Sequence, residues 1–455
     1  MTHPEQVRRQ RGIRCPAATR GDPASPARYM RGRAVGGRDA PVAPVGLRRR
    51  WHWLCTHALW NGCAVTTIEE SGSFMSIATT KSCATARMPL ARALELGPHR
   101  WDRLGEHSGS GSPFLSWAWH QASAEAVPAE EVDACQAVVL RSGAGEVDAV
   151  FPFRVRRHRL WGVPVAAVGW AFGDLGCPDH LELLATPRAD LDTLAGALEG
   201  LPWSLIRLDN VAERAVNVAR FCSACERRGW NVRRRLIGRY PYLELPPSWD
   251  AYLSGLSSHA RHAVRHKERK LFREHGVVVT DYGSDRLEEG LHHLQRLHTV
   301  RWGGGGAFRD PAWERLHRRF AASMAERGLL WLVTLDLDGT PAAAWYGFAQ
   351  RDTLYHYQNG RDVRFERERV GTVLTALMIR RAIERGFRRL DFLRGEEAYK
   401  REWTASSSGR YEVVVFRDGW RGAALRGLDK IVRRLPHRAS PLEADGGRRG
   451  LPTPG

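Results

Sequence analysis

The sequence predicts an α/β chain made of two similar halves that follow a basic tail. Short apolar runs of strand composition alternate with amphipathic stretches of helical period over residues 88–435. The order of these elements is the same in both halves. The chain has 455 residues, 43% of them apolar, which is enough for sizeable cores in two or three domains.

The two ends of the chain are expected to be disordered. Residues 1–87 form a basic tail, and its first fifty residues are rich in Pro, Gly and Arg without apolar periodicity. Because Met75 and Met88 precede the first globular stretch, an over-extended translation start is the alternative explanation. We also expect disorder over residues 436–455.

In the first half, residues 88–245, we expect an antiparallel meander followed by a crossover helix. The predicted elements are the strands Ala137–Leu140, Val147–Val155 and Val163–Val168, the helix Ala189–Leu198, the strand Ser204–Leu208, the helix Glu213–Arg228 and the strand Tyr242–Leu245. Pro246 and Pro247 then end this half.

The second half, residues 246–435, repeats this order after additional helices. The predicted elements are the helices His259–Glu274, Leu287–Trp302 and Pro311–Arg327, the strands Leu329–Leu337, Ala342–Phe348 and Leu354–Gln358, the helix Thr372–Arg385, the strand Arg388–Leu393, the short helix Glu396–Trp403 and the strand Tyr411–Arg417. The tripeptide Arg-Leu-Asp occurs at 207–209 and at 389–391, each time in the strand after the crossover helix. This repetition in register favours a duplicated α/β unit.

The net charge of +19 at pH 7 favours polyanions, acidic membrane surfaces or phosphate-bearing ligands as partners. Of the 69 basic residues, 64 are Arg, a skew more typical of a GC-rich coding sequence than of selected phosphate contacts. The eight cysteines are sparse and fit a reducing, cytoplasmic location. The one CxxC, Cys222 to Cys225, has no second ligand pair at zinc spacing, so we predict no metal site.

No stretch of the sequence is expected to span a membrane. The uncharged run Leu160–Gly173 is shorter than the roughly 20 residues that a spanning helix needs. Trp51–Ile68 is too polar and too far from the start to serve as a signal peptide. Peripheral membrane contact remains an open alternative.

The first candidate site is the start of the predicted helix at residues 370–373. A helix N-terminus offers unpaired N–H groups and the positive end of a dipole, which suit a pyrophosphate. The preceding loop adds the cations Arg361, Arg364, Arg367 and Arg369. The alternative is a solvated basic loop.

The second candidate site is the strand end at Asp391–Trp403. Function in an open α/β sheet usually lies at such a strand end. Asp391, Arg394, Glu396 and Tyr399 gather there. The Tyr399 phenol can donate a proton to a leaving thiolate. The alternative for Tyr399 is an amphipathic side chain packed where a helix meets the sheet.

These motifs resemble the FemAB-like branch of the GNAT acyltransferases, also called CelD-like or cellulose-biosynthesis acetyltransferases. The resemblance covers about residues 95–430, and the first half, from Pro113–Trp117, is similar to the degenerate N-terminal unit of those proteins. The matching stretches are 390–403 (LDFLRGEEAYKREW), Ser258–Arg265, the Leu-His-x-x-Arg-Trp segment 297–302 and the crossover helix after Val370 and Gly371.

The resemblance implies two tandem GNAT-like domains, each a mixed and mostly antiparallel sheet flanked by helices. It implies acyl-CoA, for example acetyl-CoA, as the co-substrate and an amine or hydroxyl as the acceptor, with a cell-envelope polysaccharide or glycan precursor as one possibility. By this analogy Gly371 and Thr372 cradle the pyrophosphate and Tyr399 faces the sulfur. Arg367, Arg369, Val370, Arg394 and Lys400 complete the expected cofactor site. Of the usual phosphate loop, residues 368–373 keep only the central Gly371.

The acceptor needs a base, because an ammonium cannot attack and a hydroxyl attacks poorly. The candidates are His356, Asp391 and Glu396; their alternatives are a half-buried strand residue, a turn residue and a helix cap. His298, Arg301 and Trp302 are candidates for the acceptor cleft. The basic helix with Arg261 and Arg265 is either a solvated face or a contact for a polyanionic acceptor.

Two other functions compete with acyl-CoA-dependent transfer. One is FemAB-like aminoacyl transfer from a charged tRNA, which would use the basic charge. The other is a non-catalytic pseudo-enzyme that binds polyanions. No Ser/His/Asp or Cys/His set supports a covalent route, so direct transfer is expected. The sequence leaves the oligomeric state open.

Overall fold

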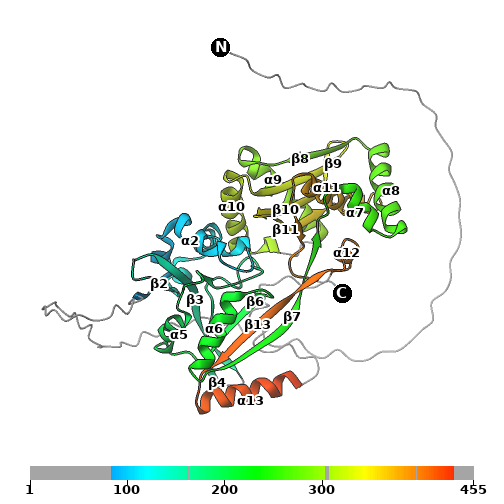
Figure 1. The fold of residues 1–455 in the computed structure, drawn as a ribbon. Helices are drawn as coiled ribbons and strands as arrows, with labels where there is room; N and C mark the ends of the chain where they lie inside the picture. The colour runs from blue at the N-terminus through cyan, green and yellow to red at the C-terminus, as the bar shows by residue number, and fades with distance from the viewer. Residues whose placement is uncertain (1–83, 161–162, 303–306, 396, 435–455) are drawn as a thin grey trace, which may run out of the picture. The chain divides into compact units, whose positions relative to one another are not determined.

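The computed structural model describes residues 84–160, 163–302, 307–395 and 397–434, which belong to one compact unit. The predicted tail 436–455 lies outside these residues, as does the predicted tail 1–87 apart from residues 84–87. Within the described residues, thirteen strands form a single mixed sheet in the order β1-β2-β3-β4-β6-β13-β7-β12-β11-β10-β9-β8, with β5 beside β3. Figure 1 shows where most of these strands lie. The expected α/β class with a mostly antiparallel sheet is therefore confirmed.

The first half contains the strands β1 to β7 and the helices α1 to α6. Their bounds are β1 Ala84–Pro89, α1 Leu90–Leu94, α2 Gly97–Glu106, α3 Trp117–Ala126, α4 Ala129–Asp133, β2 Cys135–Arg141, β3 Val147–Leu160, β4 Val163–Trp170, β5 Leu184–Ala185, α5 Leu191–Glu199, β6 Leu205–Ala212, α6 Val216–Arg227 and β7 Asn231–Glu244.

The second half contains the helices α7 to α13 and the strands β8 to β13. Their bounds are α7 Trp249–Gly255, α8 Ser258–Glu274, β8 Val277–Asp281, α9 Leu287–Arg301, α10 Pro311–Glu326, β9 Leu330–Leu337, β10 Thr340–Gln350, β11 Thr353–Arg361, α11 Val370–Glu384, β12 Arg389–Asp391, α12 Ala398–Arg401, β13 Ser407–Phe416 and α13 Trp420–Arg434. None of the described helices is both long enough and apolar enough to cross a bilayer.

Each half contains one parallel strand pair that is linked by a crossover helix. In the first half β4 pairs with β6 through Ala167 and Val168, and α5 lies between them in the chain. In the second half β11 pairs with β12 through Thr353–Tyr355, and α11 is the connection. The repeated element order predicted from the sequence therefore has a counterpart in the pairing.

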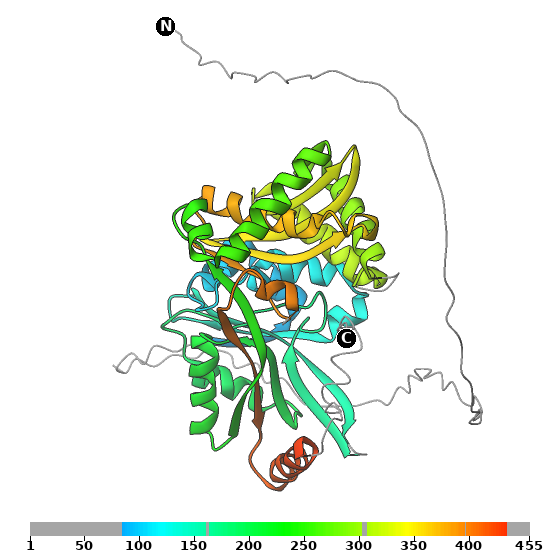
Figure 2. The same cartoon turned by 90° about the vertical axis from the view of Figure 1, so that its right-hand side faces the viewer.

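Two long strands join the halves. Residues 231–241 of β7 pair with β13, whereas Tyr242–Glu244 pair with β12 of the second half. On its other side β13 pairs with β6, so the last described strand joins the strands of the first half. Figures 1 and 2 show β7 and β13 running side by side. The predicted domain boundary after residue 245 lies at the end of β7.

The sequence reading missed part of β7 and shortened or lengthened other elements. Only the end of β7 was predicted, because the arginine-rich segment Arg233–Arg235 lacks the apolar residues typical of a strand. Pairing on both edges stabilises this strand despite its polar composition. The predicted helix Glu396–Trp403 contains only Ala398–Arg401 as α-helix. The strands β1, β5 and β8, the 15-residue helix α13 and the helices α1 to α4 and α7 were not predicted.

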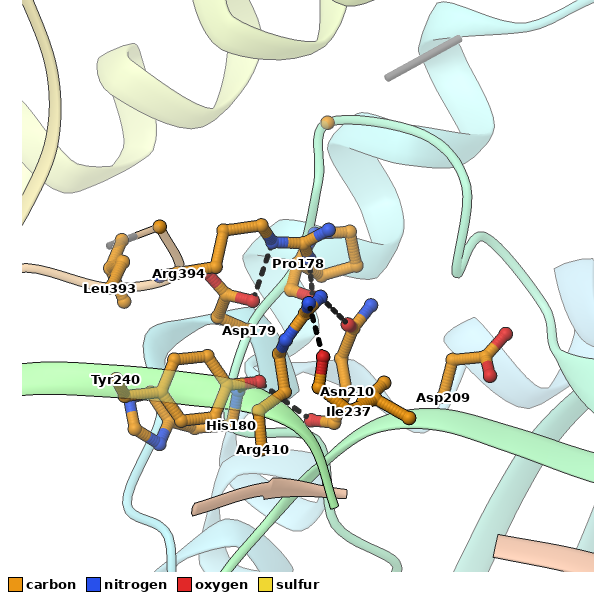
Figure 3. A network of polar contacts seen from close by, with 12 residues as sticks. Pro178, Asp179, His180, Asp209, Asn210, Ile237, Tyr240, Leu393, Arg394 and Arg410 are labelled. Carbon is orange, nitrogen blue, oxygen red and sulfur yellow. Dashed lines mark hydrogen bonds and ion pairs between the residues drawn. The ribbon is translucent and has the colours of Figure 1, made fainter. Parts of the chain in front are cut away.

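Buried polar contacts at the junction also hold the halves together (Figure 3). Arg394, which follows β12, donates from Nε to Asp179 at 2.7 Å and from its backbone N–H to the same carboxylate at 3.0 Å. Asp391 lies 3.2 Å from His180 Nε2, and the His180 ring packs on Tyr240 with centroids 3.8 Å apart. Asp391 and Asp179 are nearly inaccessible to solvent. These contacts fix the end of β12 against the first half.

Replacement of Asp179 by Ala should destabilise the chain more than loss of a surface ion pair. The change leaves the mostly buried Arg394 without its carboxylate, so we expect the free energy of unfolding to fall by about 3 kcal/mol. Asp192→Ala, which breaks an exposed pair with Arg227, is the matched control and should cost less than about 1 kcal/mol. Urea denaturation measures both, and equal losses would refute the structural role of Asp179.

Candidate functional site

The site is formed where β11 and β12 separate. The two strands pair only through Thr353–Tyr355 and Arg389–Asp391. Beyond that point the Phe392 N–H donates to the Pro241 carbonyl at 2.9 Å, and the chain turns toward the first half. β11 continues along β10 to Arg361. The carboxyl end of β11 therefore has an open edge, which is the usual location of a ligand in an open α/β sheet.

The first turn of α11 lies next to this opening. Arg369 precedes the helix in the left-handed conformation, with φ +56°, and its carbonyl accepts the N–H groups of Thr372 and Val373. No acceptor among the described residues bonds the N–H groups of Val370 and Gly371. A Cβ at Gly371 would meet only Arg361 Cδ, at 3.9 Å, so the space in front of the turn is open. These N–H groups can bind an anion.

The opening is a pocket of about 550 Å³, measured with its open mouth. Tyr399 from α12 and the first turn of α11 both line it, and Arg301 from α9 adds a cation. The lining residues are Arg301, Ala344, Trp345, Asn359, Gly360, Arg361, Gly371, Thr372, Leu374, Thr375, Tyr399, Glu402 and Trp403.

The geometry keeps Tyr399 protonated at neutral pH. Burial raises the pKa of its phenol, and a hydrogen bond with the Asn359 side chain and the cations Lys400 and Arg301 only partly oppose this. The Arg301 guanidinium carbon lies 5.9 Å from the centre of the Tyr399 ring. A protonated phenol beside a cation can donate a proton to a developing anion.

His356 lies behind Asn359 and does not line the pocket. Its ring stacks on Trp345 with centroids 4.7 Å apart, and Asn359 Nδ2 donates to His356 Nε2 at 3.4 Å. Burial, with Lys400 and Arg301, lowers the pKa of His356 to about 3. His356 is thus a neutral imidazole that contacts the pocket only through the lining residues Asn359 and Trp345.

The candidate residues at the end of α9 lie close together but differ in whether they reach the pocket. His298 is fully buried, and burial together with Arg301 lowers its pKa to about 4. Arg301 lines the pocket, its guanidinium carbon lies 4.9 Å from the centre of the Trp302 ring, and no described carboxylate forms an ion pair with it. The close approach of α9 to β11 requires Gly360, because a Cβ there would lie 2.5 Å from the His298 backbone nitrogen.

Three other candidates have their charges engaged by the protein itself. Asp391 accepts the Leu393 N–H at 2.8 Å and contacts His180. Arg394 binds Asp179. Lys400 Nζ donates to the Arg394 carbonyl at 2.5 Å and pairs with Glu397 at 2.9 Å. None of the three lines the pocket.

The remaining candidates lie at the rim or elsewhere. Arg367 and Arg369 are exposed before α11, and no ion pair is seen for them within the described chain. Val370 is buried, so it offers only its backbone. Arg261 and Arg265 lie on α8 away from the pocket lining, and Arg265 is 3.7 Å from Asp250. Glu396 lies outside the described residues.

The equivalent helix start in the first half cannot hold an anion in the same way. The Asp190 carboxylate accepts the N–H groups of Asp192 and Thr193 at 3.0 and 3.3 Å, so the protein itself occupies this end of α5. Asp192 adds a further negative charge in the first turn. An anionic ligand is therefore repelled from α5 and favoured at α11.

Sequence reasoning missed Asn359, Trp345, Glu402 and Trp403 of the lining. The predicted strand stopped at Gln358, one residue short of Asn359, although the strand pairing with β10 continues to Arg361. The signal that would have found Asn359 is the polar residue at the open carboxyl end of a strand. Within the described residues, no group of three or more His, Cys, Asp or Glu side chains is placed to hold a metal ion.

Part of the chain matches a known family model. Residues 258–401 match the family model of an acetyltransferase (GNAT) domain, a range that includes most of the pocket. No curated protein matches the sequence.

Solved structures with some likeness include FemX (12% identity, 73% of this chain and 98% of that chain, TM-score 0.49). A tandem GNAT protein from the clavulanic acid biosynthesis pathway shows 13% identity over 74% of this chain and 100% of that chain, with a TM-score of 0.42. L-PGS from Bacillus licheniformis shows 10% identity over 75% and 98%, with a TM-score of 0.45. Similarity at these low sequence identities and TM-scores assigns no ligand to this chain.

His298 should make stability depend on pH between about 4 and 6.5. Its pKa is about 4 in the folded chain, below the ordinary value of 6.5, so the unfolded chain binds more protons in this window. The free energy of unfolding then rises with pH, by up to about 1.4 kcal/mol per pH unit from this group. In His298→Asn this part of the slope should disappear.

The control for this measurement is His259→Asn, because His259 is exposed on α8 and its imidazole meets solvent in both states. Urea denaturation at several pH values between 4 and 7 gives the slopes. An unchanged slope in His298→Asn would contradict the burial of a neutral imidazole at this position.

Proposed function

We propose that this chain is an acyltransferase that takes an acyl group from acyl-CoA and passes it to an amine or hydroxyl. The observation that carries this proposal is the pair of free N–H groups at the start of α11, beside the open edge of β11 and in the pocket that Tyr399 also lines. The match of residues 258–401 to an acetyltransferase domain supports it. Acetyl-CoA is the simplest donor to test.

The donor has a binding mode that follows from the local backbone. Its pyrophosphate would accept from the N–H groups of Val370 and Gly371, at the positive end of the helix dipole. Arg367 and Arg369 would supply further positive charge. The amide-containing pantetheine arm is extended, and it would pair with the open edge of β11 as an added strand does. This arm leads the thioester toward Tyr399.

Acyl transfer needs a proton donor for the departing sulfur and a proton acceptor for the nucleophile. The nucleophile attacks the thioester carbonyl carbon, and the C–S bond breaks to release the thiol. Tyr399 would give its proton to the departing sulfur, and Arg301 would stabilise the negative charge that develops. Glu402 is the one carboxylate among the described lining residues and so joins Glu396 as a candidate base.

His356 would act as a positioning residue in this scheme. Its ring holds Asn359, and Asn359 hydrogen-bonds the Tyr399 hydroxyl. Asp391 and Arg394 would have a similar indirect role, because they fix the end of β12 against the first half. The acceptor, for which we propose a cell-envelope polysaccharide or glycan precursor, rests on the sequence resemblance alone.

A charged tRNA is a second candidate donor. The observation that favours it is the basic α8, on which Arg265, Arg269 and Lys270 are exposed. Binding of tRNA would weaken steeply with salt, because it releases counterions from several phosphates. Saturable tRNA binding without acetyl-CoA binding would favour this donor over acyl-CoA.

Gly371→Glu should weaken acetyl-CoA binding at least about tenfold, because a carboxylate at the helix start repels the pyrophosphate and competes for its N–H groups. The open space before Gly371 lets the side chain fit without disturbing the fold. Isothermal titration measures the dissociation constant.

Gly371→Gln, which has the same size without the charge, is the matched control and should weaken binding less than Gly371→Glu. Equal affinity in the parent chain and in Gly371→Glu would place the donor elsewhere. No binding at millimolar acetyl-CoA would argue against a CoA donor.

Tyr399→Phe should lower the rate of thiol release from acetyl-CoA by about 100-fold or more, because it removes the proton that the sulfur receives. The dissociation constant for acetyl-CoA should change little, since the ring remains. The rate is followed by thiol detection in the presence of a mixture of small amines. Tyr411→Phe on β13, outside the pocket lining, is the control. A full rate in Tyr399→Phe would exclude it as the proton donor.

A further inference from the structure

A second pocket lies at the opposite end of β11, where β11 and β12 begin. It measures about 810 Å³ with its open mouth, and polar atoms dominate its lining. The lining combines a loop of the first half with the β10–β11 turn and the segment before β12. Its residues are Gly109, Ser110, Gly111, Arg214, Glu244, Gln350, Arg351, Asp352, Thr353, Tyr355, Arg388 and Arg389.

The loop Ser108–Ser112, with the sequence Ser-Gly-Ser-Gly-Ser, is held in place through its oxygen atoms. Tyr355 donates its hydroxyl to the Gly111 carbonyl at 3.4 Å. Just before the loop, Arg351 Nη2 donates to the Gly105 carbonyl at 2.9 Å, and at its end Ser112 Oγ donates to the Asp179 carbonyl at 2.9 Å. The loop is therefore fixed before any ligand arrives.

Two backbone N–H groups and one hydroxyl of the same loop are free to donate hydrogen bonds. The backbone N–H groups of Gly109 and Ser110 have no acceptor among the described residues. The Ser110 hydroxyl is buried at the pocket and has no hydrogen-bond partner there. A buried donor without a partner is costly. A ligand that supplies oxygen acceptors would relieve this cost at the Ser110 hydroxyl and could also accept from the two N–H groups of the same loop.

The charge of the pocket is also suited to an anion. Its lining carries four Arg side chains against the two carboxylates Glu244 and Asp352. Arg389 pairs with Glu244 at 2.5 Å, and Arg388 is only loosely associated with Asp352, at 4.0 Å. Arg214 and Arg351 form no ion pair within the described chain. Because Arg351 is held by the Gly105 carbonyl, Arg214 and Arg388 are the two cations of the lining whose guanidinium groups are most available to a ligand.

We infer that this pocket is a second anion site, which takes a phosphate group of a small ligand on the Ser108–Ser112 loop and the Arg214 and Arg388 guanidinium groups. Oxygen atoms of a phosphate accept from backbone N–H groups, a hydroxyl and guanidinium groups together. The site is separate from the pocket at α11, because it involves Thr353 and Tyr355 whereas that pocket involves Asn359–Arg361 at the other end of β11. The inference does not depend on the proposed acyl transfer.

Gly109 sets how closely the loop can approach the arginines. A Cβ at this residue would lie 2.1 Å from the Arg214 carbonyl oxygen, so any larger residue would push the two segments apart. Gly111 has φ +58°, and its Cβ position lies 3.2 Å from Arg351 Nη1. Both glycines thus allow the loop and the cations to line one small space.

The test titrates pyrophosphate, and separately orthophosphate, into the full chain that carries Gly371→Glu, which impairs the proposed α11 site. We expect saturable binding of one pyrophosphate per chain. Arg214→Gln with Arg388→Gln should weaken it at least about tenfold, and Ser110→Ala several-fold. Arg188→Gln, which removes an exposed arginine outside the pocket, is the control and should leave the affinity unchanged.

A second arm tests the source of the phosphate with phosphatidylcholine vesicles that do or do not contain phosphatidic acid. Vesicle binding that is lost in the double Arg variant would support the site and identify a lipid headgroup as the source. Full pyrophosphate and vesicle binding in both the double Arg variant and Ser110→Ala would overturn the inference. Absence of saturable binding of any of these probes to the parent chain would also overturn it.

Thermal unfolding of each variant shows whether it is folded. Should the double Arg variant fail to fold, Ser110→Ala decides the question alone, because it removes one oxygen atom from a loop whose other contacts stay in place. Acetyl-CoA binding to the chain with an intact Gly371 is measured in parallel. Loss of that binding alone would refute the proposed donor and leave the second anion site standing.

Discussion

The candidate site depends on the short parallel pairing between β11 and β12. Three residues of each strand pair, and then the chain after Asp391 turns to the first half while β11 continues. This separation exposes the carboxyl edge of β11 and opens the space that Tyr399, Arg301 and the start of α11 line. A longer pairing would close that space, because backbone hydrogen bonds would fill the edge.

Contacts with the first half, outside the pocket, stabilise this separation of β11 and β12. Asp179 holds Arg394, His180 contacts Asp391, and the β7 and β13 strands join both halves into one sheet. The first half also contains a similar parallel pair and crossover helix, but Asp190 occupies the helix start. One copy of the repeated unit thus offers an anion site while the other acts as its support.

The sequence allowed prediction of the parts that depend on local composition. The crossover helix, its free start at Gly371 and Tyr399 beside it follow from periodicity, turn chemistry and a motif. The hydrogen bonds and ion pairs that occupy Asp391, Arg394 and Lys400 inside the protein could not be predicted. Their partners are distant in sequence or are backbone oxygens. The full length of β7 could not be predicted either, because pairing with the distant strands β13 and β12 stabilises it despite its arginine-rich composition.

Amide hydrogen exchange with and without acetyl-CoA shows whether the start of α11 binds the donor. Donor binding at α11 predicts slower exchange in peptides that cover residues 368–373 and 356–361, with no change at the start of α5, residues 190–194. Protection at α5, or saturation with acetyl-CoA that leaves residues 368–373 unprotected, would contradict it.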